Sequence, residues 1–77
     1  KEMPDGSYTT RLFKAGINKM AQKVGEEAVE VVIASKDDDR DRLLDEAADL
    51  LYHLMVLLEA RDAGIGDVAR ILEKRHR

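Results

Sequence analysis

The 77-residue sequence contains no cysteine and no tryptophan, and its aromatic residues are two tyrosines and one phenylalanine. Without cysteine, neither a disulfide nor a thiolate-bound metal can form. No apolar run approaches the ~20 residues that a membrane-spanning helix needs, and no signal peptide is visible. We therefore expect a disulfide-free protein of the cytoplasm that does not enter a membrane.

Proline is also scarce, since the only one is Pro4, followed at once by Asp5 and Gly6. This is a turn composition, so we expect an irregular start. No strand-like alternation, internal repeat or low-complexity tract follows. A chain of this size buries only about 60% of the surface that it exposes when unfolded, which leaves a monomer marginally stable. We expect one domain over residues 1–77, with a partner subunit.

Apolar residues recur at intervals of three and four, which predicts helices. We expect a short helix after Ser7, its N-cap, that stops at Gly16 in a left-handed conformation. The two long helices should cover residues 18–35 and 40–63, the latter ending near Gly64. A short helix from residue 66 onward has a narrow apolar stripe and should serve as a peripheral brace.

The helix predicted at 40–63 has an unusually wide apolar arc of about 160°, whereas packing on one side needs little more than ~100°. It should therefore be buried on two sides. The fold class that we predict is all-α, a bundle of two long and two short helices whose dimer has a four-helix core, or a higher homo-oligomer. The arc consists of Leu43, Leu44, Ala47, Leu50, Leu51, Leu54, Met55, Leu57 and Leu58.

Negative charge is concentrated in residues 26–50, where ten acids face three bases. Such a segment repels a nucleic-acid backbone, so we do not expect nucleic-acid binding. A small phosphorylated ligand carried by a cation is compatible with it. Three of these acids, Asp37, Asp38 and Asp39, precede a helix and are interpreted as capping residues rather than as a metal loop.

Five other acids are spaced for metal binding. Glu26, Glu27 and Glu30 share one helical face, and Glu46 and Asp49, three apart, share a face of the next helix. Carboxylate pairs on neighbouring helices form an oxygen cage suited to Mg²⁺ or Mn²⁺. Such a site favours phosphoanhydride cleavage by a metal-activated water.

The alternative for each acidic pair is a solvated helix surface. Glu26, Glu27 and Glu30 repel one another, however, and Lys23 is the one cation close enough in sequence for local relief. Clustering therefore destabilises the helix unless a cation binds, which favours the metal site.

Three segments of the chain are distinctive: Gly-Ser-Tyr-Thr-Thr-Arg-Leu, Gln-Lys-Val-Gly-Glu-Glu-Ala-Val-Glu-Val and Asp-Glu-Ala-Ala-Asp-Leu-Leu-Tyr-His-Leu. They resemble phosphoribosyl-ATP pyrophosphohydrolases of histidine biosynthesis, within the MazG-like all-α superfamily of nucleoside triphosphate pyrophosphohydrolases, and the resemblance extends from about Asp5 to His76. It implies Mg²⁺-dependent hydrolysis of phosphoribosyl-ATP to phosphoribosyl-AMP and pyrophosphate, with a nucleotide as the small-molecule substrate.

The resemblance also implies roles for individual residues. The metal ligands become Glu27, Glu30, Glu46 and Asp49, and Glu26 becomes either an acid behind the ligands or a base that orients water, so the catalytic residues are Glu26, Glu27 and Glu30. Candidates to bind substrate are Lys23, Arg11, Lys14 and Tyr8, with Lys19 as a further phosphate contact; ordinary solvated surface is the alternative for Arg11, Lys14 and Lys19.

Two aromatic positions have open roles. Tyr8 either lines the nucleotide pocket or fixes the first helix to the core. His53 either orients Asp49, touches substrate, or is a packed and satisfied side chain, which is the interpretation we favour. The rival functions are a MazG-like enzyme for another nucleotide and a non-catalytic helical dimerisation module.

Overall fold

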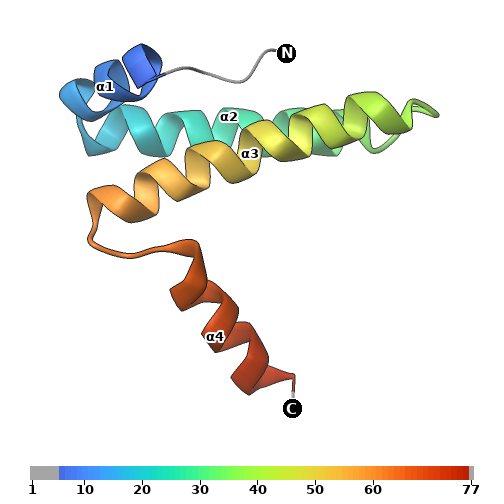
Figure 1. Ribbon diagram of the computed structural model, residues 1–77. Helices are drawn as coiled ribbons and strands as arrows, with labels where there is room; N and C mark the ends of the chain where they lie inside the picture. The colour runs from blue at the N-terminus through green and yellow to red at the C-terminus, as the bar shows by residue number, and fades with distance from the viewer. Residues whose placement is uncertain (1–5, 77) are drawn as a thin grey trace.

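The computed structural model describes residues 6–76, which form four helices and, over that range, no strand. The all-α prediction is thus confirmed (Figure 1). The two long helices lie side by side and antiparallel, a short helix lies against one end of this hairpin, and the last helix points away from it. The helices are α1 (Gly6–Ala15), α2 (Ile17–Ala34), α3 (Arg40–Ala60) and α4 (Ile65–Arg75).

The tight connection between α2 and α3 carries the aspartates that the sequence assigned to capping. Asp39 is the N-cap of α3, and its side chain accepts a hydrogen bond from the Arg42 backbone N–H at 3.0 Å. Asp37 forms an ion pair with the Arg42 guanidinium at 2.5 Å. The capping interpretation is confirmed, and these contacts fix where α3 begins relative to α2.

A single residue, Gly16, separates α1 from α2. Its φ of 95° lies in the region that favours glycine, and its backbone N–H bonds to the carbonyls of Leu12 and Phe13, each at 3.2 Å. The stop predicted at Gly16 is confirmed. The prediction for Ser7 is wrong, because α1 already begins at Gly6 and Ser7 therefore lies inside the helix.

The helix α3 ends at Ala60, three residues earlier than predicted, and Asp62 has a positive φ of 59° in the loop that follows. Gly64 is the N-cap of α4, where its N–H donates to Asp67 Oδ2 at 2.8 Å. No residue of α4 is buried, and the helix diverges from the hairpin (Figure 1). It is peripheral as predicted, but it does not brace the long helices.

The apolar core is small and lies where α1 meets the hairpin. Its buried members are Leu12, Met20 and Val56. Partly buried apolar residues pack against them: Tyr8, Tyr52, Leu57 and Ala60. Among residues 6–76 no large side chain is fully buried, so this core alone contributes modest stability.

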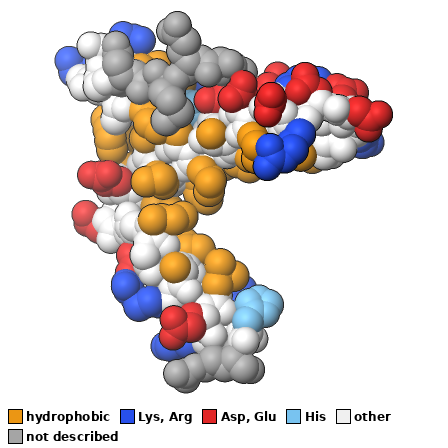
Figure 2. All heavy atoms as spheres, turned by 45° about the vertical axis from the view of Figure 1, so that its right-hand side comes forward, with side chains coloured by type: hydrophobic (Ala, Val, Ile, Leu, Met, Phe, Trp, Pro, Cys, Tyr) orange, Lys and Arg blue, Asp and Glu red, His pale blue; other side chains and the backbone are white. Residues whose placement is uncertain are grey.

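The hairpin buries polar residues where the sequence predicted leucines. The buried side chains of α3 are Glu46, Asp49, His53 and Val56, whereas Leu44, Leu51 and Met55 of the predicted core arc are about half exposed. The leucine arc was expected to be buried, but in the single chain these polar residues occupy the most buried positions of α3 and part of the arc is exposed. Hydrophobic side chains gather on the hairpin and continue onto α4 in Figure 2.

Within residues 6–76, no helix combines the length and the apolar character that crossing a bilayer requires.

Candidate metal centre

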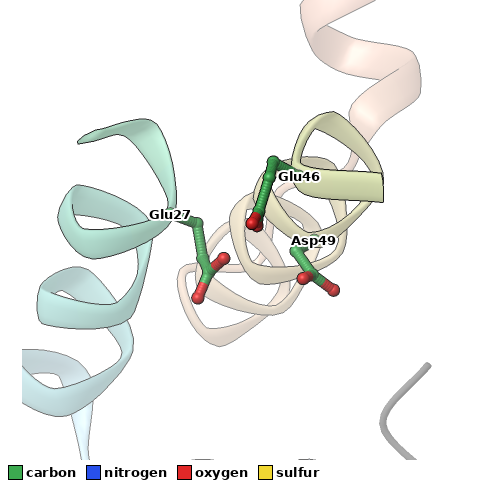
Figure 3. A group of neighbouring side chains, drawn as sticks. All are labelled: Glu27, Glu46 and Asp49. Atoms are coloured by element: carbon green, nitrogen blue, oxygen red, sulfur yellow. The ribbon is translucent and has the colours of Figure 1, made fainter. Parts of the chain in front are cut away.

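Three buried carboxylates meet between the two long helices. Glu27 projects from α2 toward Glu46 and Asp49 on α3 (Figure 3). The three side chains can offer one oxygen each, all within 4.8 Å of one another. Their exposed fractions are 5%, 6% and 4%, respectively. Carboxylates gathered so closely, and so far from solvent, are well placed to share a cation.

Helical spacing explains how these acids come to face one another. On α2, Met20, Glu27 and Ala34 are the buried residues, and they are seven apart, nearly two full turns. On α3, Glu46 and Asp49 are three apart and lie in one row. Each acid therefore occupies a position that helix–helix packing turns inward, and the site needs no special backbone geometry.

The donor set fits a hard divalent cation. Oxygen ligands, two or more of them carboxylates, are what Mg²⁺ and Mn²⁺ prefer. The three acids would repel one another strongly in a low-dielectric interior, and an ion at their centre would reverse the sign of that interaction. The group thus has the chemistry, the spacing and the burial of a metal site.

The fourth predicted ligand, Glu30, lies one turn after Glu27 on α2 and is partly exposed. Its carboxylate is not among the three that converge within 4.8 Å. The structure brings together three of the four predicted ligands, and a role for Glu30 stays a prediction.

Glu26 differs from its neighbour Glu27 because its side chain points to solvent and is 50% exposed. Lys23 Nζ lies 3.3 Å from Glu26 and 3.7 Å from Glu27, and Gln22 donates to Glu26 at 2.8 Å. The hydrogen bonds from Gln22 and then Lys23 lower the pKa of Glu26 below its usual 4.5. Glu26 therefore stays ionised and helps to hold Lys23 beside the buried acid.

Lys23 is a positively charged side chain that lies beside the carboxylates. Partial burial acts to lower its pKa, but the hydrogen bond with Glu26 and nearby negative charge outweigh this effect, and the pKa lies above its usual 10.5. The ammonium therefore keeps its charge at neutral pH. It is available to contact both Glu27 and an anionic ligand above the carboxylates.

A cluster of three rings lies next to the carboxylates, where α1 meets α3. The Tyr8 hydroxyl lies 2.8 Å from His53 Nε2, and His53 Nδ1 lies 2.8 Å from the backbone oxygen of Asp49. His53 packs edge-on against Tyr8 and Tyr52, with ring centroids 5.7 and 5.2 Å away. His53 is packed and both its ring nitrogens have hydrogen-bond partners, as we favoured, and Tyr8 packs against the core. A contact of Tyr8 with the nucleotide stays a prediction.

Burial is the largest cause of a raised pKa at Tyr8, so its hydroxyl keeps its proton and can donate to His53. The Arg11 guanidinium lies over the Tyr8 ring, 5.8 Å from its centroid. Lys14 and Lys19 are both exposed. Of the four candidate cations, Lys23 lies at the carboxylates and Arg11 is held by the ring cluster.

Sequence reasoning missed two members of this neighbourhood. Thr9 and Tyr52 join through their hydroxyls, which adds a second bridge from α1 to α3. Gln22 bonds to Glu26 four residues later, a spacing that places the two on one helical face and could have been recognised from the sequence. The Thr9 contact had no sequence signal, because it joins residues 43 apart.

Comparison with known proteins gives a consistent result. The family model described as phosphoribosyl-ATP pyrophosphohydrolase matches residues 1–76. The chain is 60% identical over 76 residues to a protein named histidine biosynthesis bifunctional protein HisIE from Xanthomonas axonopodis pv. citri. Proteins of the same name are 58% identical in Bacteroides thetaiotaomicron and 56% identical in Bacillus subtilis.

These alignments cover nearly all of this chain but only part of each relative. They take in 99%, 99% and 97% of the chain, respectively, and 37%, 37% and 36% of the relatives. The chain therefore spans little more than a third of the length of the curated relatives that it matches.

Proposed function

Because the chain belongs to the phosphoribosyl-ATP pyrophosphohydrolase family, we propose that it hydrolyses phosphoribosyl-ATP to phosphoribosyl-AMP and pyrophosphate within histidine biosynthesis. Water attacks at the α–β phosphoanhydride, the bond to the leaving pyrophosphate breaks, and phosphoribosyl-AMP carries the new oxygen. The names of the relatives, which refer to histidine biosynthesis, support the pathway. A location in the cytoplasm accords with this pathway.

The observation that carries the proposal is the convergence of Glu27, Glu46 and Asp49, buried and within 4.8 Å of one another. We propose that these three residues hold Mg²⁺ or Mn²⁺, with Glu30 as a further ligand to be tested. When bound, the ion would neutralise phosphate charge and lower the pKa of a water. The burial of the carboxylates keeps bulk water from weakening these interactions.

The chain's own residues supply binding and orientation. Lys23, held between Glu26 and Glu27, has the charge and the position to contact phosphate oxygens of the substrate. Glu26, with a lowered pKa and half its side chain in solvent, is a weak base, so we assign it to holding Lys23 rather than to activating water. Arg11 and Lys14 on α1 are proposed as further phosphate contacts.

The substrate is tested by direct assay. Purified protein is incubated with Mg²⁺ and phosphoribosyl-ATP, in parallel with a panel of ordinary and modified nucleoside triphosphates. We expect pyrophosphate and phosphoribosyl-AMP from the first and little product from the rest. Preference for another nucleotide would indicate a different pyrophosphohydrolase, and no hydrolysis with no saturable metal binding would indicate a non-catalytic helical module.

We further propose that two copies of the chain assemble through the apolar surface of the hairpin. Leu44, Leu51 and Met55 share one face of α3 and are about half exposed. Pairing this surface across a two-fold axis would bury it in a four-helix core. Sedimentation of the protein as a stable monomer at micromolar concentration would contradict this assembly.

A further inference from the structure

The strongest feature that the proposed function leaves unused is the bridge from α1 to the metal centre through Tyr8 and His53. We propose that these two residues form a positioning pair, in which His53 orients the Asp49 segment of α3 and Tyr8 fixes α1, with Arg11, against it. The inference rests on the proposed function for its kinetic readout and adds a role for two residues to which that function assigns none.

The donor and the acceptor of each of the two hydrogen bonds can be assigned. A backbone carbonyl only accepts, so His53 Nδ1 must carry the proton that it shares with the oxygen of Asp49. In the neutral ring, Nε2 is then an acceptor, and the Tyr8 hydroxyl donates to it. The His53 ring therefore links the backbone of Asp49 on α3 to the side chain of Tyr8 on α1.

The surroundings hold the His53 ring in a single orientation. The side chain is only 4% exposed, and Tyr8 and Tyr52 meet it edge-on at 87° and 89°. Along α3, His53 continues the buried row of Glu46 and Asp49, one turn beyond Asp49. A shift of the ring would therefore be transmitted to the neighbouring turn that presents the carboxylate.

The Tyr8–His53 pair is an important part of what holds α1 against the hairpin. It has ten residues, of which Leu12 alone is buried, so apolar burial holds it only weakly. Its other contacts with α3 include the Tyr8–His53 bond and the Thr9–Tyr52 bond. Arg11 lies over the Tyr8 ring. A movement of α1 would therefore also move Arg11 away from the carboxylates.

Two substitutions of His53 separate the halves of the bridge. An asparagine amide nitrogen can occupy the place of the donor Nδ1, and a glutamine amide oxygen can occupy the place of the acceptor Nε2. His53→Asn should keep the bond to Asp49 and lose Tyr8, whereas His53→Gln should keep Tyr8 and lose Asp49. Tyr8→Phe removes only the hydroxyl.

The expected results follow from this separation. Tyr8→Phe and His53→Asn should raise KM for phosphoribosyl-ATP by about fivefold, the effect of one neutral hydrogen bond, with kcat and Mn²⁺ affinity nearly unchanged. His53→Gln should weaken Mn²⁺ binding by about tenfold, as loss of an orienting contact behind a ligand does, and should lower kcat. The Tyr8→Phe, His53→Asn double variant should add little to either single variant.

Thr10→Ala is the matched control, since it removes an α1 hydroxyl whose bond to the Gly6 carbonyl faces solvent. It should leave KM, kcat and Mn²⁺ affinity at the parental values. A purely structural role for the pair would lower the melting temperature of all three variants alike and leave KM and metal affinity unchanged. That result, or identical behaviour of His53→Asn and His53→Gln, would overturn the proposal.

Amide hydrogen exchange gives a readout that needs neither substrate nor metal. Tyr8→Phe should speed exchange in α1 while α2 and α3 stay protected, because the change releases one short helix. If the parent hydrolyses no phosphoribosyl-ATP, the proposed function fails, and exchange in α1 still decides whether the pair holds that helix. Unchanged exchange in Tyr8→Phe would overturn the coupling.

Discussion

The two faces of α3 reverse the usual distribution of polarity in a small domain. The face toward α2 contains Glu46, Asp49 and His53, each no more than 6% exposed. The nearly opposite face contains Leu44, Leu51 and Met55, each 48–52% exposed. Both arrangements are unfavourable in an isolated chain, because burying charge is costly and leaving leucine in water forgoes burial energy.

The difference between the faces indicates what each one is for. Acids placed at packing positions destabilise the hairpin unless a cation offsets their repulsion, so the inner face favours ligand binding over stability. An exposed apolar row favours contact with another surface. Under the proposed function, one helix divides two tasks between its sides, metal binding inside and assembly outside, and each face can be altered separately.

The largest effect should come from removing charge on the inner face. Glu27→Gln or Asp49→Asn should lower kcat at least about 100-fold, the scale expected when transition-state charge loses a stabilising group. Without metal, the same variants should melt at or above the parental temperature, because one repelling charge is gone. An inactive variant that also melted far below the parent would indicate a structural role instead.

Glu30→Gln is the informative companion to these variants. It too should abolish hydrolysis if Glu30 completes the metal site in the working enzyme. Activity near the parental level would limit the ligands to the three carboxylates that converge within 4.8 Å.

The next largest effect should come from adding charge to the outer face. Leu51→Asp changes a side chain that is 52% exposed in the single chain, so a monomer would tolerate it. In the proposed dimer the same charge enters an apolar seam, which should prevent assembly and destabilise the protein by several kcal/mol. Sedimentation and thermal melting measure both effects, and Leu51→Met, which keeps volume and polarity, is the control.

Leu54, partly buried between the two faces, should respond more severely. Leu54→Asp places charge against both the hairpin and the dimer seam, so unfolding is the expected result. A folded monomer from either aspartate variant at parental stability would contradict assembly through this face.

Metal addition should have an intermediate effect, restricted to the inner face. An ion that binds only the folded state at 100 times its Kd stabilises it by about 2.7 kcal/mol, which for a chain of this size raises Tm by roughly 10–20 °C. The parent should show this shift with millimolar Mg²⁺ or Mn²⁺, and Leu51→Met should show it equally. Asp49→Asn should not, and an unchanged melting curve in the parent would count against the site.

The smallest effect concerns Glu26, the exposed acid beside the buried ones. Its pKa is lowered in the folded state, so its contribution to stability is present above the usual value of 4.5 and is lost as pH falls below it. Glu26→Gln should therefore flatten slightly the loss of stability between pH 5 and 3, measured by melting. Its activity should fall much less than that of Glu27→Gln; equal losses would make Glu26 the base.

Local rules predicted the elements well. Apolar periodicity located all four helices, the aspartates before Arg40 identified a helix start, and Gly16 identified a break. The spacing of Glu46 and Asp49 predicted a shared face, which the structure confirms. These features depend on residues a few positions apart, where backbone geometry leaves few choices.

Packing was harder to predict because it depends on which face of each helix meets the other. The width of the leucine arc on α3 suggested a core, but the hairpin leaves Leu44, Leu51 and Met55 of that arc about half exposed and encloses Glu46, Asp49 and His53. The apolar arc alone does not indicate whether the surface that packs against it belongs to the same chain or to another copy. The bond from Tyr8 to His53, across 45 residues, was equally beyond local pattern.

Because Gly16 alone joins α1 to α2, a small rotation at this residue changes the direction of the whole of α1. A helix of this length extends about 15 Å, so a turn of 20° at its base moves the far end by roughly 5 Å. Tyr8 lies near that far end, and a hydrogen bond tolerates only a few tenths of an ångström. Open space surrounds the Gly16 Cα, so the backbone angle of 95°, rather than crowding, restricts this position. The backbone torsion of one residue thus sets the direction of an entire helix.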